Sequence, residues 1–232
     1  MQSEQPILKL YYLDTLGRGE PIRMLLNHAK IPFEDIRSDI HEFEEFKKKI
    51  GPKFEFGQVP VIETSDGELY SQSLSIMRLL GKWYGYYPQD PIAAWKVDSL
   101  LDASGDLMEK YWHFAILEFI PDGYTPESVI AERLQEFLDT HLPQYLTVVQ
   151  DRLRKNVNSK FMVGDTVTLA EFTSAQVAFN YLMNENNKHG KLMSEVLGRE
   201  EFKEIKAYYM NLKEDIFKEY FETHRKNCQH PF

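Results

Sequence analysis

The feature that most constrains the fold is a change of sequence pattern close to residue 90. Before it, short strand-forming runs alternate with helical stretches, whereas after it strand patterns nearly vanish and long helical patterns follow. Residues 85–91 between the two parts are Gly-Tyr-Tyr-Pro-Gln-Asp-Pro, a composition typical of a linker. A chain of 232 residues can form two modest domains. We therefore predict one domain over residues 1–84, a linker over 85–91 and an all-helical domain over 92–232.

The first domain is expected to contain a mixed β-sheet with helices. Strand patterns occur at residues 7–12, 32–36, 59–63 and 68–70, and helical patterns lie between and after them. The resulting order is β-α-β-α-β-β-α. Ser65-Asp66-Gly67 predicts a hairpin turn between the last two strands. Pro60 interrupts a strand pattern, and a cis Val59–Pro60 peptide in a tight turn facing a ligand is one way to accommodate it.

Three long helical patterns dominate the second part, at residues 92–120, 125–155 and 169–187. Pro143 falls inside the second pattern and should kink that helix, because proline lacks a backbone N–H. Thr168 and Glu171 have the spacing of a capping box at the start of the third helix. Val167 and Phe172 occupy the positions of a hydrophobic staple beside it. We interpret this cap as a structural feature of the helical core.

Composition argues against several classes of protein. The net charge of −9 is spread along the chain and would repel phosphate backbones, so no nucleic-acid partner is expected. No apolar run approaches the ~20 residues of a membrane span. The single cysteine, Cys228, rules out an intrachain disulfide and fits a reducing compartment, so we expect a cytoplasmic protein. The seven histidines show no metal-ligand spacing, and no metal site is predicted.

Two polar clusters stand out as candidate sites. The first is Tyr12, at the end of a strand, followed by Gly17-Arg18-Gly19-Glu20 where a helix begins. The second is Gln58-Val59-Pro60, followed by Ser71-Gln72-Ser73 at the start of another helix. Free N–H groups at a helix N-terminus favour a carboxylate, and an unusual Val-Pro turn would leave backbone groups for an extended peptide. Helix capping alone is the alternative role for Ser71 and Ser73.

With these motifs the chain resembles the glutathione transferase family, in particular its tyrosine-dependent cytosolic classes, and most of all the sigma class. The resemblance covers essentially the whole length and implies a thioredoxin-like first domain followed by an all-helical second one. The motifs that carry it are Leu10-Tyr11-Tyr12-Leu13-Asp14-x-x-Gly17-Arg18-Gly19-Glu20, Gly57-Gln58-Val59-Pro60-Val61, Ser71-Gln72-Ser73-Leu74-x-Ile76, and Gly164-Asp165-x-Val167-Thr168-Leu169-Ala170-Glu171-Phe172.

The resemblance implies a role for each matching residue. Tyr12 would be the catalytic hydroxyl, because its register to Gly17 fits the family pattern better than that of Tyr11. Arg18 would help set the electrostatics of the site. The implied glutathione contacts are Lys47 for the glycine carboxylate, Gln58 and Val59 for the cysteinyl backbone, Gln72 and Ser73 for the γ-glutamyl carboxylate, and Asp106 of a neighbouring subunit for the α-amino group. Phe43 would form an aromatic wall of the same site, and Pro60 would belong to it as part of the Val-Pro turn. The role of Asp106 would require a homodimer.

Several positions depart from the family pattern. Phe43 replaces a tryptophan, Leu16 replaces an arginine, and Gly105 replaces an aspartate that contacts a metal in some prostaglandin-forming members. The stretch from Lys47 to Phe56 is longer than the sigma pattern, so Lys48 or Lys49 are alternatives to Lys47. Phe56 matches the aromatic key that enters the partner subunit in some classes, and a core phenylalanine is the alternative.

The expected activity is transfer of glutathione, as a cosubstrate, to a small hydrophobic electrophile, with no tightly bound cofactor. Tyr111 and Trp112 are candidates for the wall of the electrophile site, although aromatic residues in long helices more often belong to the core. The alternatives are a glutathione-dependent prostaglandin D isomerase and a non-catalytic ligand-binding or crystallin-like member of the family.

Overall fold

A computed structural model describes residues 8–119, 123–157 and 160–225 of the chain. The chain divides into two compact units, of which one comprises Met1–Tyr87 with Leu212–Phe232 and the other Pro88–Asn211. The C-terminal segment groups with the first unit because α10 (Lys218–Thr223) packs against α1 (Glu20–His28). The sequence places this segment in the helical domain by its helical pattern alone, and the boundaries 1–84, 85–91 and 92–232 remain a prediction. Cys228 lies outside the described residues.

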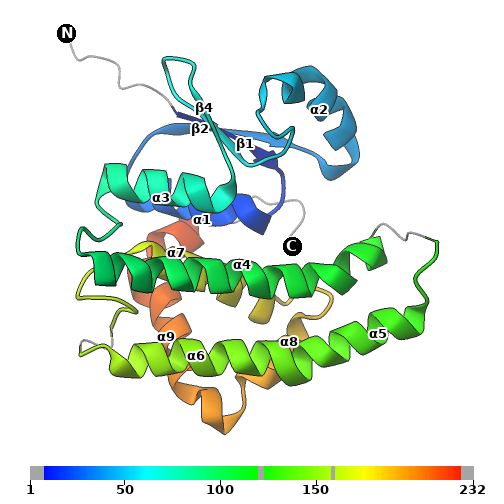
Figure 1. Ribbon diagram of the computed structural model, residues 1–232, viewed down its shortest axis with the longest axis vertical. Coiled ribbons are helices and arrows are strands. Elements are labelled where there is room, and N and C mark those ends of the chain that lie inside the picture. The colour runs from blue at the N-terminus through cyan, green and yellow to red at the C-terminus, as the bar shows by residue number, and fades with distance from the viewer. Residues whose placement is uncertain (1–7, 120–122, 158–159, 226–232) are drawn as a thin grey trace. The chain divides into compact units, whose positions relative to one another are not determined.

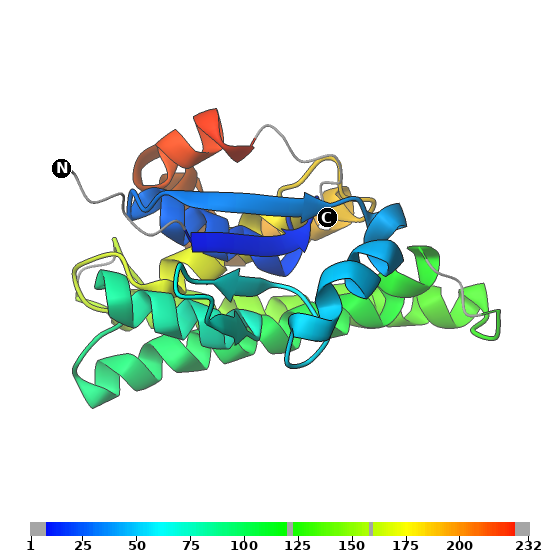
Figure 2. The same ribbon diagram turned by 90° about the horizontal axis from the view of Figure 1, so that it is seen from above.

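The first unit is built on a four-stranded mixed sheet, as the sequence predicts. The strands are β1 (Leu8–Leu13), β2 (Phe33–Ser38), β3 (Val61–Glu63) and β4 (Leu69–Ser71), in the order β2-β1-β3-β4. β1 runs parallel to β2 and antiparallel to β3, which forms an antiparallel hairpin with β4. Figure 2 shows β1 and β2 side by side, with α2 (Phe43–Ile50) beyond their carboxyl ends.

Helices cover this sheet because they present long apolar faces. α1 and α3 (Ser73–Tyr84) pack against each other on one side of the strands (Figure 1). α1 is buried along most of its length, and Pro21 occupies its first turn, where the missing N–H costs no hydrogen bond. Leu10, Ile22, Leu25 and Met77 are fully buried and form part of the core of this unit.

The second unit is helical throughout its described residues. Its α-helices are α4 (Pro91–Phe119), α5 (Glu127–Glu136), α6 (Leu142–Lys155), α7 (Leu169–Gln176), α8 (Gly190–Leu197) and α9 (Lys203–Asn211). α4 lies alongside the line formed by α5 and α6 (Figure 1), and α7 packs on α4. An aromatic cluster that includes Phe114, Phe137 and Tyr181 fills the core between these helices. Among the helices that the structure describes, none combines the length and apolar character needed to cross a bilayer.

The second long helix contains a π-helical turn close to Pro143, where the sequence predicts a kink. A π-helical turn, Phe137–His141, separates α5 from α6, and Pro143 stands in the first turn of α6. The wider turn accommodates the missing N–H of proline without ending the chain of helical bonds.

The third long helix is shorter than predicted. It ends at Leu182, after a second π-helical turn over Val177–Leu182, and does not continue to residue 187. The amide side chain of Asn184 donates to the Asn180 carbonyl and accepts from the Asn186 N–H, and the Met183 N–H bonds to the Ala178 carbonyl. Such local side-chain bonds compete with further helical turns.

The capping box predicted at the start of α7 is present. The Thr168 hydroxyl accepts from the Ala170 N–H at 3.3 Å, and Glu171 Oε2 accepts from the Thr168 N–H at 2.8 Å. Glu171 is completely buried, and its other oxygen accepts from the Met162 N–H and from the Tyr208 hydroxyl. The cap therefore ties the loop before α7 and helix α9 to one carboxylate. Burial raises the pKa of Glu171, while these hydrogen bonds oppose that shift.

Candidate functional site

Tyr12 sits near the end of β1 with its side chain buried and its ring enclosed by two glycines. A Cβ on Gly19 would come within 2.5 Å of Tyr12 Cδ1, and one on Gly17 within 2.4 Å of Tyr12 Oη. Both distances are shorter than any real Cβ contact, so the loop can wrap the ring only because these residues lack a side chain. Gly17 also has a φ of +35°, which disfavours other residues there. The two glycines of the Gly-Arg-Gly motif therefore leave the space that the tyrosine ring occupies.

The Tyr12 hydroxyl accepts hydrogen bonds and keeps its own proton available. Its oxygen accepts from the Arg18 N–H at 2.8 Å and from the Thr15 hydroxyl. Burial raises the pKa of Tyr12, while the Arg18 N–H bond, the charges of Arg23 and Arg18 and the Thr15 bond partly offset it. Tyr12 therefore stays protonated at neutral pH and can act as a hydrogen-bond donor. The sequence did not single out Thr15, because a threonine in a turn has no distinctive pattern.

Tyr11 points to the opposite face of the sheet, as alternation along a strand requires. Its hydroxyl donates to Glu63 Oε2 at 2.7 Å, and its ring packs on Phe54 with a centroid distance of 5.4 Å. Burial and the neighbouring Glu63 carboxylate raise the pKa of Tyr11 to about 12. Tyr11 thus has a packing and hydrogen-bonding role of its own, and the two tyrosines occupy separate environments.

The sheet register brings three of the sequence-predicted residues to one end. Tyr11 pairs with Val61 and Val61 pairs with Ser71. Extending this register by one residue places Tyr12 of β1 beside Pro60, just before β3, and Pro60 beside Gln72, just after β4. The Val59–Pro60 peptide is cis, which is one of the ways to accommodate Pro60 that the sequence allows. Gln58 is exposed and Val59 is half-buried, so both are accessible at this end of the sheet.

α3 begins directly after this row of residues. Gln72 is its N-cap and Ser73 its first residue, and Gln72 has φ +71° and ψ 109°, a conformation that non-glycine residues rarely adopt. Such backbone conformations persist only where the surrounding structure holds them, and they cluster at ligand-binding sites. The N–H groups of the first turn of this 12-residue helix give a ready place for a carboxylate.

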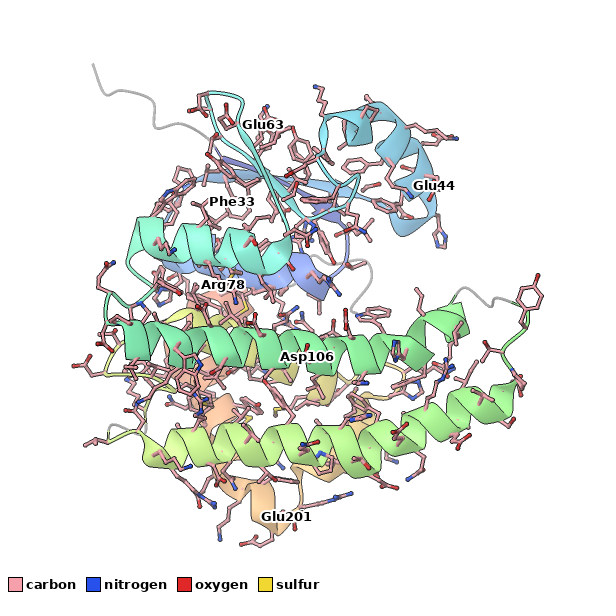
Figure 3. The ribbon with its side chains drawn as sticks, viewed as in Figure 1. Phe33, Glu44, Glu63, Arg78, Asp106 and Glu201 are labelled. Atoms are coloured by element: carbon pink, nitrogen blue, oxygen red, sulfur yellow. The ribbon has the colours of Figure 1, made fainter. Side chains whose placement is uncertain are left out.

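α2 follows from the same end of the sheet, since β1 and β2 are parallel and Leu13 pairs with Ser38. Lys47 Nζ lies 5.0 Å from the centroid of the Phe43 ring and forms an ion pair with Glu44 at 2.6 Å. Figure 3 shows Glu44 on this helix. Lys48 and Lys49 are exposed, whereas Lys47 is half-buried against Phe43. Among the three alternatives from the sequence, Lys47 is the lysine held beside the aromatic ring.

The remaining sequence-predicted residues belong to the second unit. Asp106 is exposed in the middle of α4 (Figure 3). Tyr111 is only 3% exposed, packs against Trp112 and Tyr181, and exchanges hydrogen bonds with Asn187. Trp112 is half-buried and offers more surface. This geometry gives Tyr111 mainly a core role, which is typical of aromatic residues in long helices.

Two further observations bear on the departures from the family pattern. Phe56 is 53% exposed, so it does not serve as a core residue within this chain. Within the described ranges, no three His, Cys, Asp or Glu side chains gather in a way that could hold a metal ion.

Comparisons with known proteins agree on one family for both units. Residues 19–83 match the family model "Glutathione S-transferase, N-terminal domain", and residues 110–224 match "Glutathione S-transferase, C-terminal domain". Glutathione S-transferase 1 of Ascaris suum is 35% identical over 167 residues, which cover 72% of this chain and 76% of that protein. A hematopoietic prostaglandin D synthase of Gallus gallus is 30% identical, over 72% of this chain and 75% of its own.

The fold comparison points the same way. The crystal structure of the glutathione S-transferase from Ascaris lumbricoides superposes with a TM-score of 0.74 at 28% identity. The superposition covers 97% of this chain and all of that one.

Proposed function

Because this chain belongs to the glutathione S-transferase family, we propose that it conjugates glutathione to hydrophobic electrophiles, with Tyr12 stabilising the glutathione thiolate. The observation that carries this proposal is the environment of Tyr12. Its oxygen accepts from the Arg18 N–H and its raised pKa keeps the proton on it, so the hydroxyl can donate to a sulfur anion. Glutathione is the cosubstrate, and no tightly bound cofactor takes part.

The chemical contribution of this hydroxyl can be bounded. A free thiol has a pKa of about 8.5, so only a few per cent is thiolate at neutral pH. A hydrogen bond donated to the thiolate lowers that pKa, and about two units correspond to ~2.7 kcal/mol. The gain in thiolate is limited to roughly 30-fold, because the initial fraction is a few per cent. Orientation of the electrophile beside the sulfur must supply much of the remaining acceleration.

We place glutathione along the end of the sheet where Tyr12, Pro60 and Gln72 succeed one another. Gln58 and Val59 would pair with its cysteinyl backbone, Gln72 and Ser73 would bind the γ-glutamyl carboxylate, and Phe43 with Lys47 would face the glycine carboxylate. The strained Gln72 backbone and the α3 N-terminus support the second of these contacts.

A homodimer completes this proposal. Asp106 would reach the α-amino group of glutathione bound to a second subunit, and its exposed position on α4 supports that role. The exposed Phe56 offers a side chain that a partner could cover. Trp112, rather than the buried Tyr111, supplies aromatic surface for the electrophile site. We further propose the cytoplasm as the compartment, because the only cysteine, Cys228, fits a reducing environment.

The test compares Tyr12→Phe with Tyr11→Phe as a matched control. We expect Tyr12→Phe to lower kcat/KM for conjugation of an aromatic chloride by ~10- to 30-fold at pH 7, because less thiolate forms. Tyr11→Phe should stay within about 2-fold of the unmodified protein, since Tyr11 lies on the other face of the sheet. Equal rates for Tyr12→Phe and the unmodified protein would exclude the assigned role of Tyr12.

A glutathione-dependent prostaglandin D isomerase is the second candidate, favoured by the similarity to the Gallus gallus prostaglandin D synthase. Product analysis with a prostaglandin endoperoxide separates it from general conjugation. A non-catalytic carrier or crystallin-like protein would turn over no electrophile, whether or not glutathione resin retains it. Retention, turnover and product analysis together therefore distinguish the three functions.

A further inference from the structure

Arg23 is an almost completely buried charge directly behind the Tyr12 loop. It lies on α1 and is 2% exposed, although arginine is rarely buried unless it is fully paired. Its Nη1 donates to the Thr15 carbonyl at 2.7 Å and its Nη2 donates to the Leu13 carbonyl at 3.1 Å. These carbonyls belong to two of the first three residues after Tyr12. The guanidinium therefore fixes the path of the chain where it leaves the strand.

We propose that Arg23 is a positioning residue for Tyr12, and that the C-terminal segment holds Arg23 in place through Glu20. The inference rests on the proposed role of Tyr12 in thiolate stabilisation. It assigns a function to the C-terminal helix that neither the sequence motifs nor the family likeness provides.

The carboxylates around Arg23 link it to the sheet and to the end of the chain. Asp35 on β2 accepts from Arg23 Nε at 2.9 Å. Glu20, which is 1% exposed, places one oxygen 3.5 Å from Arg23 Nη1 and the other 3.4 Å from Arg225 Nη1. Tyr220 on α10 also hydrogen-bonds Glu20. Glu20 therefore connects the C-terminal segment with Arg23.

Arg23 also acts on Tyr12 through its charge. The Arg23 guanidinium carbon lies 5.6 Å from the centroid of the Tyr12 ring. Its positive charge lowers the pKa of Tyr12, against the larger rise that burial causes. A displaced guanidinium would thus alter both the position of the Tyr12 hydroxyl and its strength as a donor.

The same helix offers a matched control contact. Glu219 on α10 forms an ion pair with Lys30 just beyond α1, and both side chains are 66% exposed. This pair joins α10 to the residues just after α1 but does not touch Glu20. Glu219→Gln therefore weakens the docking of α10 and leaves the chain of contacts to Arg23 intact, whereas Arg225→Gln removes one of its members.

The experiment measures kcat/KM for the electrophile against pH, at saturating glutathione, for Arg225→Gln, Arg23→Lys and Glu219→Gln. We expect the apparent pKa of the bound thiol to rise by about half a unit in Arg225→Gln, which is a loss of ~3-fold below that pKa and little loss above it. Arg23→Lys, which keeps the charge but not the forked geometry, should lose ~10-fold below that pKa. Glu219→Gln should match the unmodified protein across the pH range.

A second measurement without glutathione separates this inference from the proposed function. The ¹³Cζ resonance of labelled tyrosine at position 12 is assigned by its absence in Tyr12→Phe. We expect it to move in Arg23→Lys and Arg225→Gln and to stay in Glu219→Gln. An unchanged resonance, or equal effects of Arg225→Gln and Glu219→Gln, would overturn the positioning role. If the unmodified protein conjugates no electrophile, the proposed function fails while this measurement still decides the place of Tyr12.

Discussion

At the scale of single residues, the space around the Tyr12 ring sets the sharpest constraint on the site. Gly19 has a φ of −81°, which an alanine adopts without strain, so Gly19→Ala tests steric fit alone. We expect kcat/KM for conjugation to fall ~10- to 100-fold, because the new Cβ would stand 2.5 Å from Tyr12 Cδ1 and must displace the ring. Steady-state kinetics measure this loss.

Gly51→Ala is the control for that substitution. Gly51 also has a negative φ of −55°, and its Cβ would meet the nearest atom at an ordinary 3.7 Å. Its activity should be unchanged. Equal activity of the Gly19→Ala and Gly51→Ala proteins would show that the Tyr12 ring can shift without loss of function.

The sequence motifs include Glu20 in the first cluster but do not single out Arg23, its buried partner. Glu20 and Arg23, spaced i and i+3 among apolar residues, are the one signal that was available, since charges on a buried helix face must be paired. Their partners come from β2 and from the C-terminal segment, far away in sequence. Spacing patterns describe neighbours along one element, and they give no information on which distant element will complete an ion pair.

At the scale of elements, the N-terminus of α3 combines a proposed ligand contact with an unfavourable backbone conformation. We expect Gln72→Gly to raise the free energy of unfolding by up to about 1 kcal/mol, because glycine tolerates a φ of +71°. The same change should raise KM for glutathione, since the side-chain amide is lost. Urea unfolding and steady-state kinetics measure the two effects. A destabilised protein would show that the backbone conformation is unstrained.

The cap of α7 gives a second prediction at this scale. Thr168→Ala should cost ~1 kcal/mol, the usual loss of an N-cap. Glu171→Ala should cost more, roughly 3 kcal/mol, because it leaves the buried Met162 and Thr168 N–H groups without their acceptor. Exposed Thr166→Ala serves as the control in urea unfolding. A larger loss in Thr168→Ala than in Glu171→Ala would contradict this order.

The helices also show where prediction from sequence succeeds and where it stops. Local signals found the capping box at Thr168, because it depends on residues within one turn. Pro143 likewise marked the place where the helix departs from regular α-helical geometry, although the structure has a π-helical turn there and the sequence predicts a kink. The end of the third helix was predicted at residue 187 and lies at Leu182. Residues 183–187 contain no proline or glycine that would end the predicted helix. Asn184 instead bonds the neighbouring backbone, and this competition depends on side-chain geometry that periodicity does not describe.

At the scale of the whole molecule, buried tyrosine hydroxyls couple stability to alkaline pH. Burial raises the pKa of Tyr111 and of Tyr145 to about 12, and that of Tyr209 well above its usual value. The unfolded chain releases these protons near pH 10, so it binds fewer protons than the folded protein above that pH. The stability contributed by the protonated hydroxyls is therefore complete below about pH 10 and is lost as pH rises from there towards 12.

We accordingly expect the free energy of unfolding, measured in urea, to fall steeply between pH 10 and 11. Tyr209→Phe should make this slope shallower by up to about 1.4 kcal/mol per pH unit, the contribution of one proton. Comparison between variants cancels the lysines, which titrate in the same range in every protein compared. Tyr124→Phe is the control, because Tyr124 is 90% exposed and its replacement should leave the slope unchanged. If Tyr209→Phe and Tyr124→Phe gave equal slopes, the buried hydroxyls would not be the source of the alkaline instability.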